Sequence, residues 1–325
     1  MTAFWNAAVG KLVERWLATG LAAAVYWLAL SALWVLGSAD ARAEASGRLR
    51  DLARLNAGEQ VVLLLVGLVV LAGSGLVMAQ LTLPVLRLLE GYWPRWADPL
   101  SRRLCERHGR RWDVCDAEAD ALMRRHLGVA DADGLVGPPL DHDERLRLTR
   151  LEEQLRWMPA RDRMLPTRLG NSMRAAEGRP LHHYGLDAVV LWPHLWSVLP
   201  DTLRLDLAAA RRHVDGLVAA GLWGLFLLPA AVRTPWALLG LPFACVMWCG
   251  ALPGACREFG VLIRTAFDLH RWDLYRALRH PVPLDAASEV AAGERLTAAV
   301  LRGSDDPALV YTSDSLPGSV TGGSA

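Results

Sequence analysis

The stretch QVVLLLVGLVVLAGSGLVMAQLTLPVL, residues 60–86, contains no charged residue and no histidine, and it decides the class of this protein. A helix that crosses about 30 Å of hydrocarbon needs roughly 20 apolar residues, because each residue advances it by 1.5 Å. A helix also satisfies its own backbone hydrogen bonds, which lipid cannot do. Residues 60–86 therefore predict a transmembrane helix.

Three further stretches are free of charged residues and histidine: 16–39, 216–232 and 234–256. Only Arg233 separates the last two, so they predict a tight helical hairpin. The first stretch could instead be a secretory signal peptide, although the apolar part of such a peptide is only about 7–15 residues long. The sequence predicts an all-α protein with four transmembrane helices, arranged as two hairpins with a helical cytoplasmic domain inserted between spans two and three.

The basic residues predict the orientation. If the N-terminus, the long middle region and the C-terminal region share one side of the membrane, that side holds 30 basic residues and the other holds 5. Loops rich in Arg and Lys remain in the cytoplasm. We therefore expect a multi-pass protein of the inner (plasma) membrane with both termini in the cytoplasm.

Breaks marked by Pro and Gly divide the rest of the chain into stretches of Ala, Leu, Arg and Glu, a composition typical of helices. Helices are expected near residues 98–108, 116–127, 143–157, 168–177 and 186–199, and from residue 201 onward, with a loop at 128–140. The domain boundaries follow as an N-terminal hairpin region at 1–89, a helical cytoplasmic domain at 90–213, a second hairpin at 214–256, an amphipathic helical region at 257–302 and a disordered tail at 303–325.

Arg257, Arg264 and Arg271 recur at a spacing of seven residues after the fourth apolar stretch. On a helix this spacing keeps the guanidinium groups near one line. Anionic lipid headgroups attract such a line of positive charge. The pattern predicts that these three arginines lie at the inner membrane surface.

Composition and motifs argue against several functions. The chain has 35 basic and 34 acidic residues and a formal net charge of +1, so it is not expected to bind nucleic acid. Lys11 is the only lysine, and its neighbours do not form a phosphate-binding loop. No HExxH, GxSxG or GxGxxG motif occurs, and the Cys and His spacings do not fit a metal site. We therefore predict no catalytic residue, no metal and no cofactor.

Residues 168–187 hold the most distinctive set of polar side chains. Arginine forks bind phosphate or carboxylate through paired hydrogen bonds, so this segment is a candidate site for an anionic ligand. An alternative is purely structural: Thr167 caps a helix, Gly170 permits close packing, and Arg174 pairs with Glu177. The candidate ligand-binding residues are Arg168, Asn171, Arg174, Arg179, Tyr184 and Asp187, with His182 and His183 among them.

Pro180 and Gly185 lie inside the same segment. Proline lacks the N–H that an interior helical residue donates, and glycine often ends a helix. These two residues argue against one continuous helix through the candidate site.

Four segments carry a resemblance to a known group of proteins: LPTRLGN at 165–171, RAAE at 174–177, YGLDAVVLWP at 184–193 and AFDLHRWDLY at 266–275. Through them the chain resembles multi-pass integral membrane proteins of GC-rich bacteria, for which no activity is known. The resemblance implies a helical cytoplasmic module between two transmembrane hairpins. It carries over no catalytic residue.

These features favour a non-enzymatic membrane protein whose Arg-rich helical module binds a cytoplasmic protein or an anionic ligand, as a scaffold or a sensor. Two alternatives remain open: an oligomeric channel gated by that module, and a membrane enzyme acting on a phosphorylated or lipid substrate. Pairs of small residues four apart, such as Ala220 with Gly224 and Gly240 with Ala244, allow close helix packing within the chain or in a homo-oligomer. The lipid bilayer is the one partner that every alternative requires.

Overall fold

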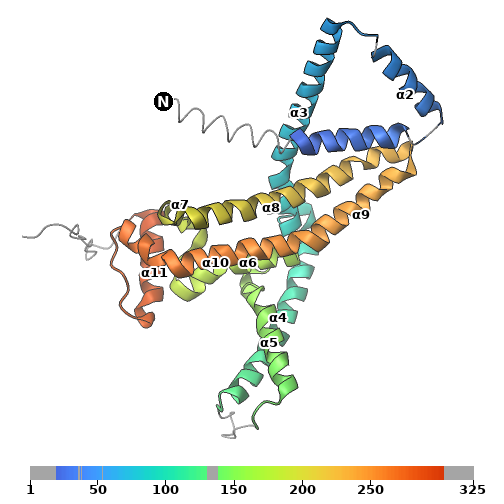
Figure 1. The fold of residues 1–325 in the computed structure, drawn as a ribbon. Helices are drawn as coiled ribbons and strands as arrows, with labels where there is room; N and C mark the ends of the chain where they lie inside the picture. The colour runs from blue at the N-terminus through green and yellow to red at the C-terminus, as the bar shows by residue number, and fades with distance from the viewer. Residues whose placement is uncertain (1–19, 36, 38, 53, 130–137, 304–325) are drawn as a thin grey trace, which may run out of the picture. The chain divides into compact units, whose positions relative to one another are not determined.

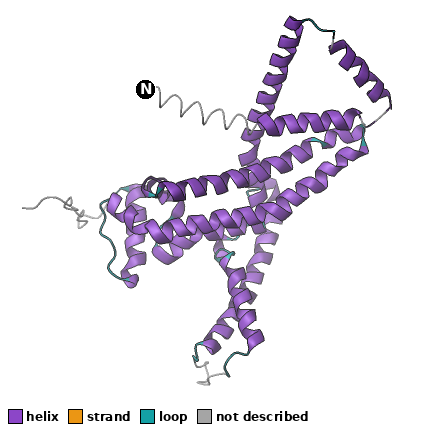
Figure 2. Ribbon diagram, in the orientation of Figure 1, coloured by secondary structure: helices purple, strands orange, loops and turns teal. Residues whose placement is uncertain are grey.

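The computed structural model describes residues 20–35, 37, 39–52, 54–129 and 138–303. These residues are mostly helical, and no strand occurs among them (Figure 2). The all-α prediction is confirmed. The chain divides into two compact units, Met1–Arg87 with His213–Gly254, and Leu88–Arg212 with Ala255–Ala325. It passes from one unit to the other within three helices, which are α3 (Ala57–Glu90), α8 (Asp201–Phe226) and α10 (Leu252–Ala277).

Three helical stretches in the described part of the chain are long and apolar enough to cross a membrane: Ala57–His126, Asp201–Val232 and Pro235–Ala277. Each contains one of the charge-free stretches recognised in the sequence. The stretch at 16–39 is described only from residue 20, where Gly20–Val35 forms a shorter apolar helix, followed by α2 (Ala39–Leu52). Three candidate spans are thus observed.

The apolar half of α3 is exposed. Leu64 is 73% exposed, Val69 is 69% exposed, and their neighbours between residues 61 and 70 are similarly open. A continuous run of exposed apolar side chains is unfavourable in water. It is typical of a surface that lipid or another protein covers. The exposure of α3 therefore agrees with a location in lipid.

The predicted hairpin after residue 216 is present in the first unit. α8 is followed by two short turns of 3₁₀ helix, η3 (Leu228–Val232) and η4 (Pro235–Leu239), which pack against each other. The chain then continues through α9 (Gly240–Cys245) and a π-helical turn, η5 (Val246–Ala251). A Cβ atom at Gly240 would lie 2.1 Å from the carbonyl oxygen of Gly224, so these two small residues pack the hairpin of this chain.

The second unit contains two helical groups (Figure 1). The first is an antiparallel pair whose facing sides bury Cys115, Leu122, Leu148 and Leu151. The second encloses the main core, in which Leu191, Leu195, Phe267, Tyr275 and Leu296 are at most 1% exposed. The pair is α4 (Asp98–His126) and α5 (His142–Arg156), preceded by η1 (Arg95–Ala97) and followed by η2 (Arg161–Arg163); the larger group combines α6 (Arg168–Tyr184), α7 (Ala188–Val198) and α11 (Ala286–Arg302) with parts of α8 and α10.

Two helices are longer than the sequence predicted. α4 is continuous, whereas we expected separate helices at 98–108 and 116–127, because Gly109 is buried and packs near Arg161. One glycine costs a helix only about 1 kcal/mol, and packing outweighs that cost. α6 runs through Pro180 and ends at Gly185, which has the left-handed φ of 70°. The expected interruption at Pro180 is therefore wrong, and α6 extends beyond the helix expected at 168–177 as far as Gly185.

The C-terminal helical region does not stand apart from the inserted domain. Ile263, Phe267 and Leu274 of α10, and Leu296 of α11, share one core with α7 and α8. Residues 304–325 of the predicted tail and most of the predicted loop at 128–140 lie outside the described residues.

Candidate functional site

The N-terminus of α6 is held by four hydrogen bonds, two made by Thr167 and two made by Asn171. The Thr167 hydroxyl accepts from the Gly170 N–H and donates to the Glu90 carbonyl, at 3.0 and 2.8 Å. Gly170 is required here, because a Cβ atom would lie 1.8 Å from that Glu90 oxygen. The Asn171 side chain, only 3% exposed, accepts from the Leu165 N–H and donates to the Leu165 carbonyl. These hydrogen bonds fix the position and direction of the first turn of α6.

The following turns of α6 form one wall of a pocket of about 210 Å³. Its α6 lining residues are spaced three and four apart, so they lie on one helical face. The opposite wall comes from the end of α5 and the segment after it, and one residue comes from α10. The lining residues are Leu155, Arg156, Met158, Pro159, Ala160, Arg163, Arg174, Ala175, Gly178, Arg179, His182, His183 and Arg264.

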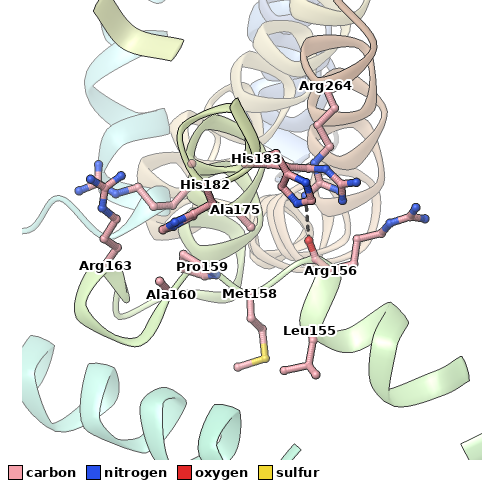
Figure 3. A pocket seen from close by; sticks show the side chains of 13 residues that line it. Leu155, Arg156, Met158, Pro159, Ala160, Arg163, Ala175, His182, His183 and Arg264 are labelled. Carbon is pink, nitrogen blue, oxygen red and sulfur yellow. Dashed lines mark hydrogen bonds between the residues drawn. The ribbon is translucent and has the colours of Figure 1, made fainter. Parts of the chain in front are cut away.

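Five arginines and two histidines line this pocket, and no aspartate or glutamate does. Figure 3 shows Arg163 and Arg264 on opposite sides of the view, with His182 and His183 between them. Arg156 has a weak ion pair with Glu153 at 3.8 Å. Among the described residues, no carboxylate lies within 4.0 Å of the other four arginine side chains. The pocket therefore concentrates positive charge, and none of its lining residues is acidic.

Arg264 is the most buried of these arginines, at 7% exposure. Its guanidinium group donates to the Arg156 carbonyl at 2.8 Å and lies 4.4 Å from the centre of the Trp157 ring. Burial, together with the positive charges of Arg179 and Arg156, lowers the pKa of Arg264 to about 10. The group is still protonated at neutral pH, but its neighbours disfavour its charge.

Arg174 is held in a similar way. One of its terminal nitrogens donates to the Tyr92 hydroxyl at 3.3 Å, while its Nε is buried without a hydrogen-bond partner, as is the Nε of Arg264. Unpaired buried donors are costly. The expected Arg174–Glu177 ion pair within 4.0 Å does not form in the described structure.

The pocket gathers only part of the candidate set from residues 168–187. Arg174 and Arg179 line it, whereas Asn171 acts on the backbone of Leu165 as described above. Asp187 caps α7 by accepting from the N–H groups of Val189 and Val190. Tyr184 donates to Asp268 at 2.8 Å, and its ring lies 4.4 Å from the guanidinium carbon of Arg271.

Arg168 lines a second basic pocket of about 300 Å³. That pocket also lacks acidic lining residues. Its other lining residues are Leu104, Arg107, His108, Arg111 and Pro166.

The three arginines expected at the membrane surface have different positions. Arg264 is buried in the second unit, which differs from the expectation of an exposed line of charge, because Trp157 and the end of α5 cover it. Arg271 pairs with Glu289 of α11 at 2.7 Å, and its side chain is only 19% exposed. Arg257 is exposed, 5.9 Å from the centre of the Trp157 ring, and its membrane contact stays a prediction.

Sequence reasoning missed Arg156, Arg163 and Gly178 as pocket residues, and it assigned Arg264 to another surface. The sequence of α6 did indicate part of the pocket lining. Arg174, Gly178 and His182 are each four residues apart, which places them on one face of a helix. No sequence pattern relates that helix to α10, because their contact depends on tertiary packing.

The described residues contain no group of three or more His, Cys, Asp or Glu side chains that could hold a metal ion. No family model matches this chain, and neither curated proteins nor solved structures gave a match. The geometry of the pocket is therefore the basis for a functional proposal.

Proposed function

We propose that this chain is a membrane protein whose helical second unit binds an anionic ligand in the pocket of α5, α6 and α10, and so acts as a sensor or scaffold. The observation that supports this proposal is the lining of five arginines and two histidines with no acidic residue. Positive groups brought together in a partly buried site repel one another, and burial of unpaired charge costs several kcal/mol. A bound anion removes both costs.

The membrane location is part of the proposal. Three apolar helices support it, and Gly20–Val35 with the preceding apolar residues would supply a fourth span. With 30 basic residues on one side, the second unit and both termini would face the cytoplasm of the cell membrane. The pocket would then sample cytoplasmic anions or the headgroups of the inner leaflet.

The test uses the full chain in nanodiscs of zwitterionic phosphatidylcholine. Its unfolding temperature is measured in sodium sulfate and in sodium chloride at equal ionic strength. Sulfate stabilises most proteins without a specific site, so variants are essential. We expect sulfate to stabilise the unsubstituted chain by about 2–3 kcal/mol near a hundredfold excess over its Kd. Arg179→Gln and Arg264→Gln should lose most of that gain.

Arg150→Gln is the matched control, because Arg150 is exposed on α5 and does not line the pocket. It should keep the full effect of sulfate. An equal sulfate effect in all four proteins would contradict binding in the pocket and remove the basis of the proposed function.

A further inference from the structure

One residue that lines the pocket is a glycine. Gly178 lies in the interior of α6, and a Cβ atom built on it would meet nothing within 4 Å. On either side of it along the same face are Arg174 and His182. Glycine weakens a helix interior by about 0.5–1 kcal/mol relative to alanine, so it has a cost at this position without any packing benefit inside the protein. The structure thus leaves open the space directly between the positive side chains.

One side of this space is apolar. Leu155, Met158, Pro159 and Ala160 line it from the end of α5 and the segment that follows, and Arg156 is the one charged residue of that stretch. The guanidinium and imidazole groups come mainly from α6, η2 and α10, and the view in Figure 3 places Leu155 and Met158 apart from Arg163, His182 and Arg264. The pocket therefore offers a ligand one charged side and one apolar side.

Its volume of about 210 Å³ is below the roughly 300–1,000 Å³ of pockets that enclose drug-sized ligands. A whole nucleotide would not fit, but a small anionic group with a short carbon segment would. Four guanidinium groups with no carboxylate of the described residues within 4.0 Å favour a dianion over a monoanion, because the attraction grows with the ligand charge. A phosphate monoester carries about −1.5 to −2 charge at pH 7, and its oxygens match the forks of arginine.

We infer that the pocket takes a phosphate monoester, with the phosphate among Arg174, Arg179 and Arg264 over Gly178 and the ester carbons against residues 155–160. This inference rests on the proposed function and names the ligand class of the same site. The ester could belong to a soluble metabolite or to a lipid headgroup such as that of phosphatidate. The same chemistry recognises both.

The experiment measures binding by calorimetry to the full chain in phosphatidylcholine nanodiscs. The soluble probes are glycerol 3-phosphate, dimethyl phosphate and acetate. Glycerol 3-phosphate should bind at least about tenfold more tightly than the two monoanions, because it carries nearly twice their charge. A second arm compares unfolding temperatures in nanodiscs that contain phosphatidate, a monoester, with those that contain phosphatidylglycerol, a diester.

Binding of glycerol 3-phosphate in neutral nanodiscs supports the inference with a soluble ligand as the source. Stabilisation by phosphatidate alone, without stabilisation by phosphatidylglycerol, supports it with the lipid as the source. Equal affinity for all three soluble probes, together with equal effects of the two lipids, overturns the inference. If sulfate still acts through Arg179 and Arg264 in that case, the proposed anion site survives, so the two failures can be distinguished.

Gly178→Leu tests the position of the ligand. Leucine fills open space and favours the helix, so this variant should fold at least as well as the unsubstituted chain and should lose about tenfold or more in affinity for the monoester. Gly216→Leu is the control, because Gly216 is an exposed helical glycine that, like Gly178, has nothing within 4 Å of its Cβ position, and it does not line the pocket. If Gly178→Leu fails to fold, the affinity of Arg179→Gln for the monoester is measured instead, and it should be reduced in the same way. Unchanged monoester affinity in the folded variant would overturn the assignment.

Discussion

At the scale of single residues, Asn171 shows how a polar side chain that suggests ligand binding can serve the fold. Its amide forms a two-way contact with the backbone of Leu165, at 2.6 Å to the N–H and 2.9 Å to the carbonyl. The side chain is 3% exposed, so water cannot replace it. The structural alternative proposed for this segment is correct for Thr167, which caps α6, and for Gly170, which allows close packing. Asn171, predicted as a ligand-binding residue, has a structural role as well.

We expect Asn171→Ala to reduce the free energy of unfolding by about 2–4 kcal/mol, because it leaves the N–H and carbonyl of Leu165 without partners. Ser172→Ala is the neighbouring control. Its hydroxyl is also buried but makes one contact, to the Leu169 carbonyl, so its loss should cost about 1 kcal/mol. Urea unfolding of both variants provides the measurement, and equal costs would show that the Leu165 contact is unimportant.

His183 makes stability depend on pH. Burial lowers the pKa of His183, and the charge of Arg179 lowers it further, while Asp268 opposes this and His182 and Arg264 add to it. A histidine with a depressed folded pKa binds protons more readily when the chain is unfolded. Its contribution to stability is therefore complete above the unfolded pKa of about 6.5 and is lost as the pH falls through the lower folded value.

Without ligand, the unfolding temperature should fall as the pH is lowered from about 7.5 to about 5.5, the range that brackets the unfolded pKa. The fall should be smaller in His183→Gln. It should not vanish, since burial also lowers the pKa values of His108 and His280. An identical pH profile for His183→Gln would show that this histidine does not contribute.

At the scale of elements, glycines decide how closely α6 approaches its neighbours. Gly293 of α11 lies against the end of α6, where a Cβ atom would be 1.8 Å from the Tyr184 carbonyl oxygen. Gly185 in turn packs against α11, because a Cβ atom added to it would lie 2.1 Å from the Val290 carbonyl oxygen. α11 packs on α6 and α7 through these contacts, and this packing closes the core.

The same substitution at two glycines should have opposite effects. Gly293→Ala should cost at least about 2 kcal/mol, because backbone atoms cannot move aside as easily as a flexible side chain. Gly178→Ala should stabilise the chain by about 0.5–1 kcal/mol, since its Cβ would meet open space on a helix. The unfolding temperatures of both variants provide the measurement: it should fall in Gly293→Ala and rise in Gly178→Ala. An unchanged unfolding temperature for Gly293→Ala would contradict the close packing of α11 on α6.

At the scale of the whole molecule, long apolar helices coexist with a unit rich in arginine. The exposed apolar side chains of α3 require a nonpolar surrounding, whereas the second unit carries its own hydrophobic core. This division agrees with a protein that spans a membrane and presents a folded unit on one side. The proposed cytoplasmic position of that unit rests on the arginine distribution alone.

Labelling of intact cells with a membrane-impermeant thiol reagent tests on which side of the membrane each unit lies. Ser46→Cys, in exposed α2, should be labelled above the background of the unsubstituted chain, whose five cysteines set that background. Asp143→Cys, exposed on α5, should be labelled only after the cells are opened. Labelling of Asp143→Cys in intact cells would reverse the proposed orientation.

The sequence by itself determined the helical class, the charge-free stretches and the Thr167 cap of α6, because these depend on local composition and backbone geometry. It could not determine the length of α4 and α6, where packing outweighs the local cost of Gly109 and Pro180. The tertiary structure alone brought Arg264 of α10 over Trp157 and beside the arginines of α6. Arg264 lies far from the α6 arginines in the chain. The seven-residue spacing of Arg257, Arg264 and Arg271 shows that they share one face of a helix, but it does not show what that face packs against.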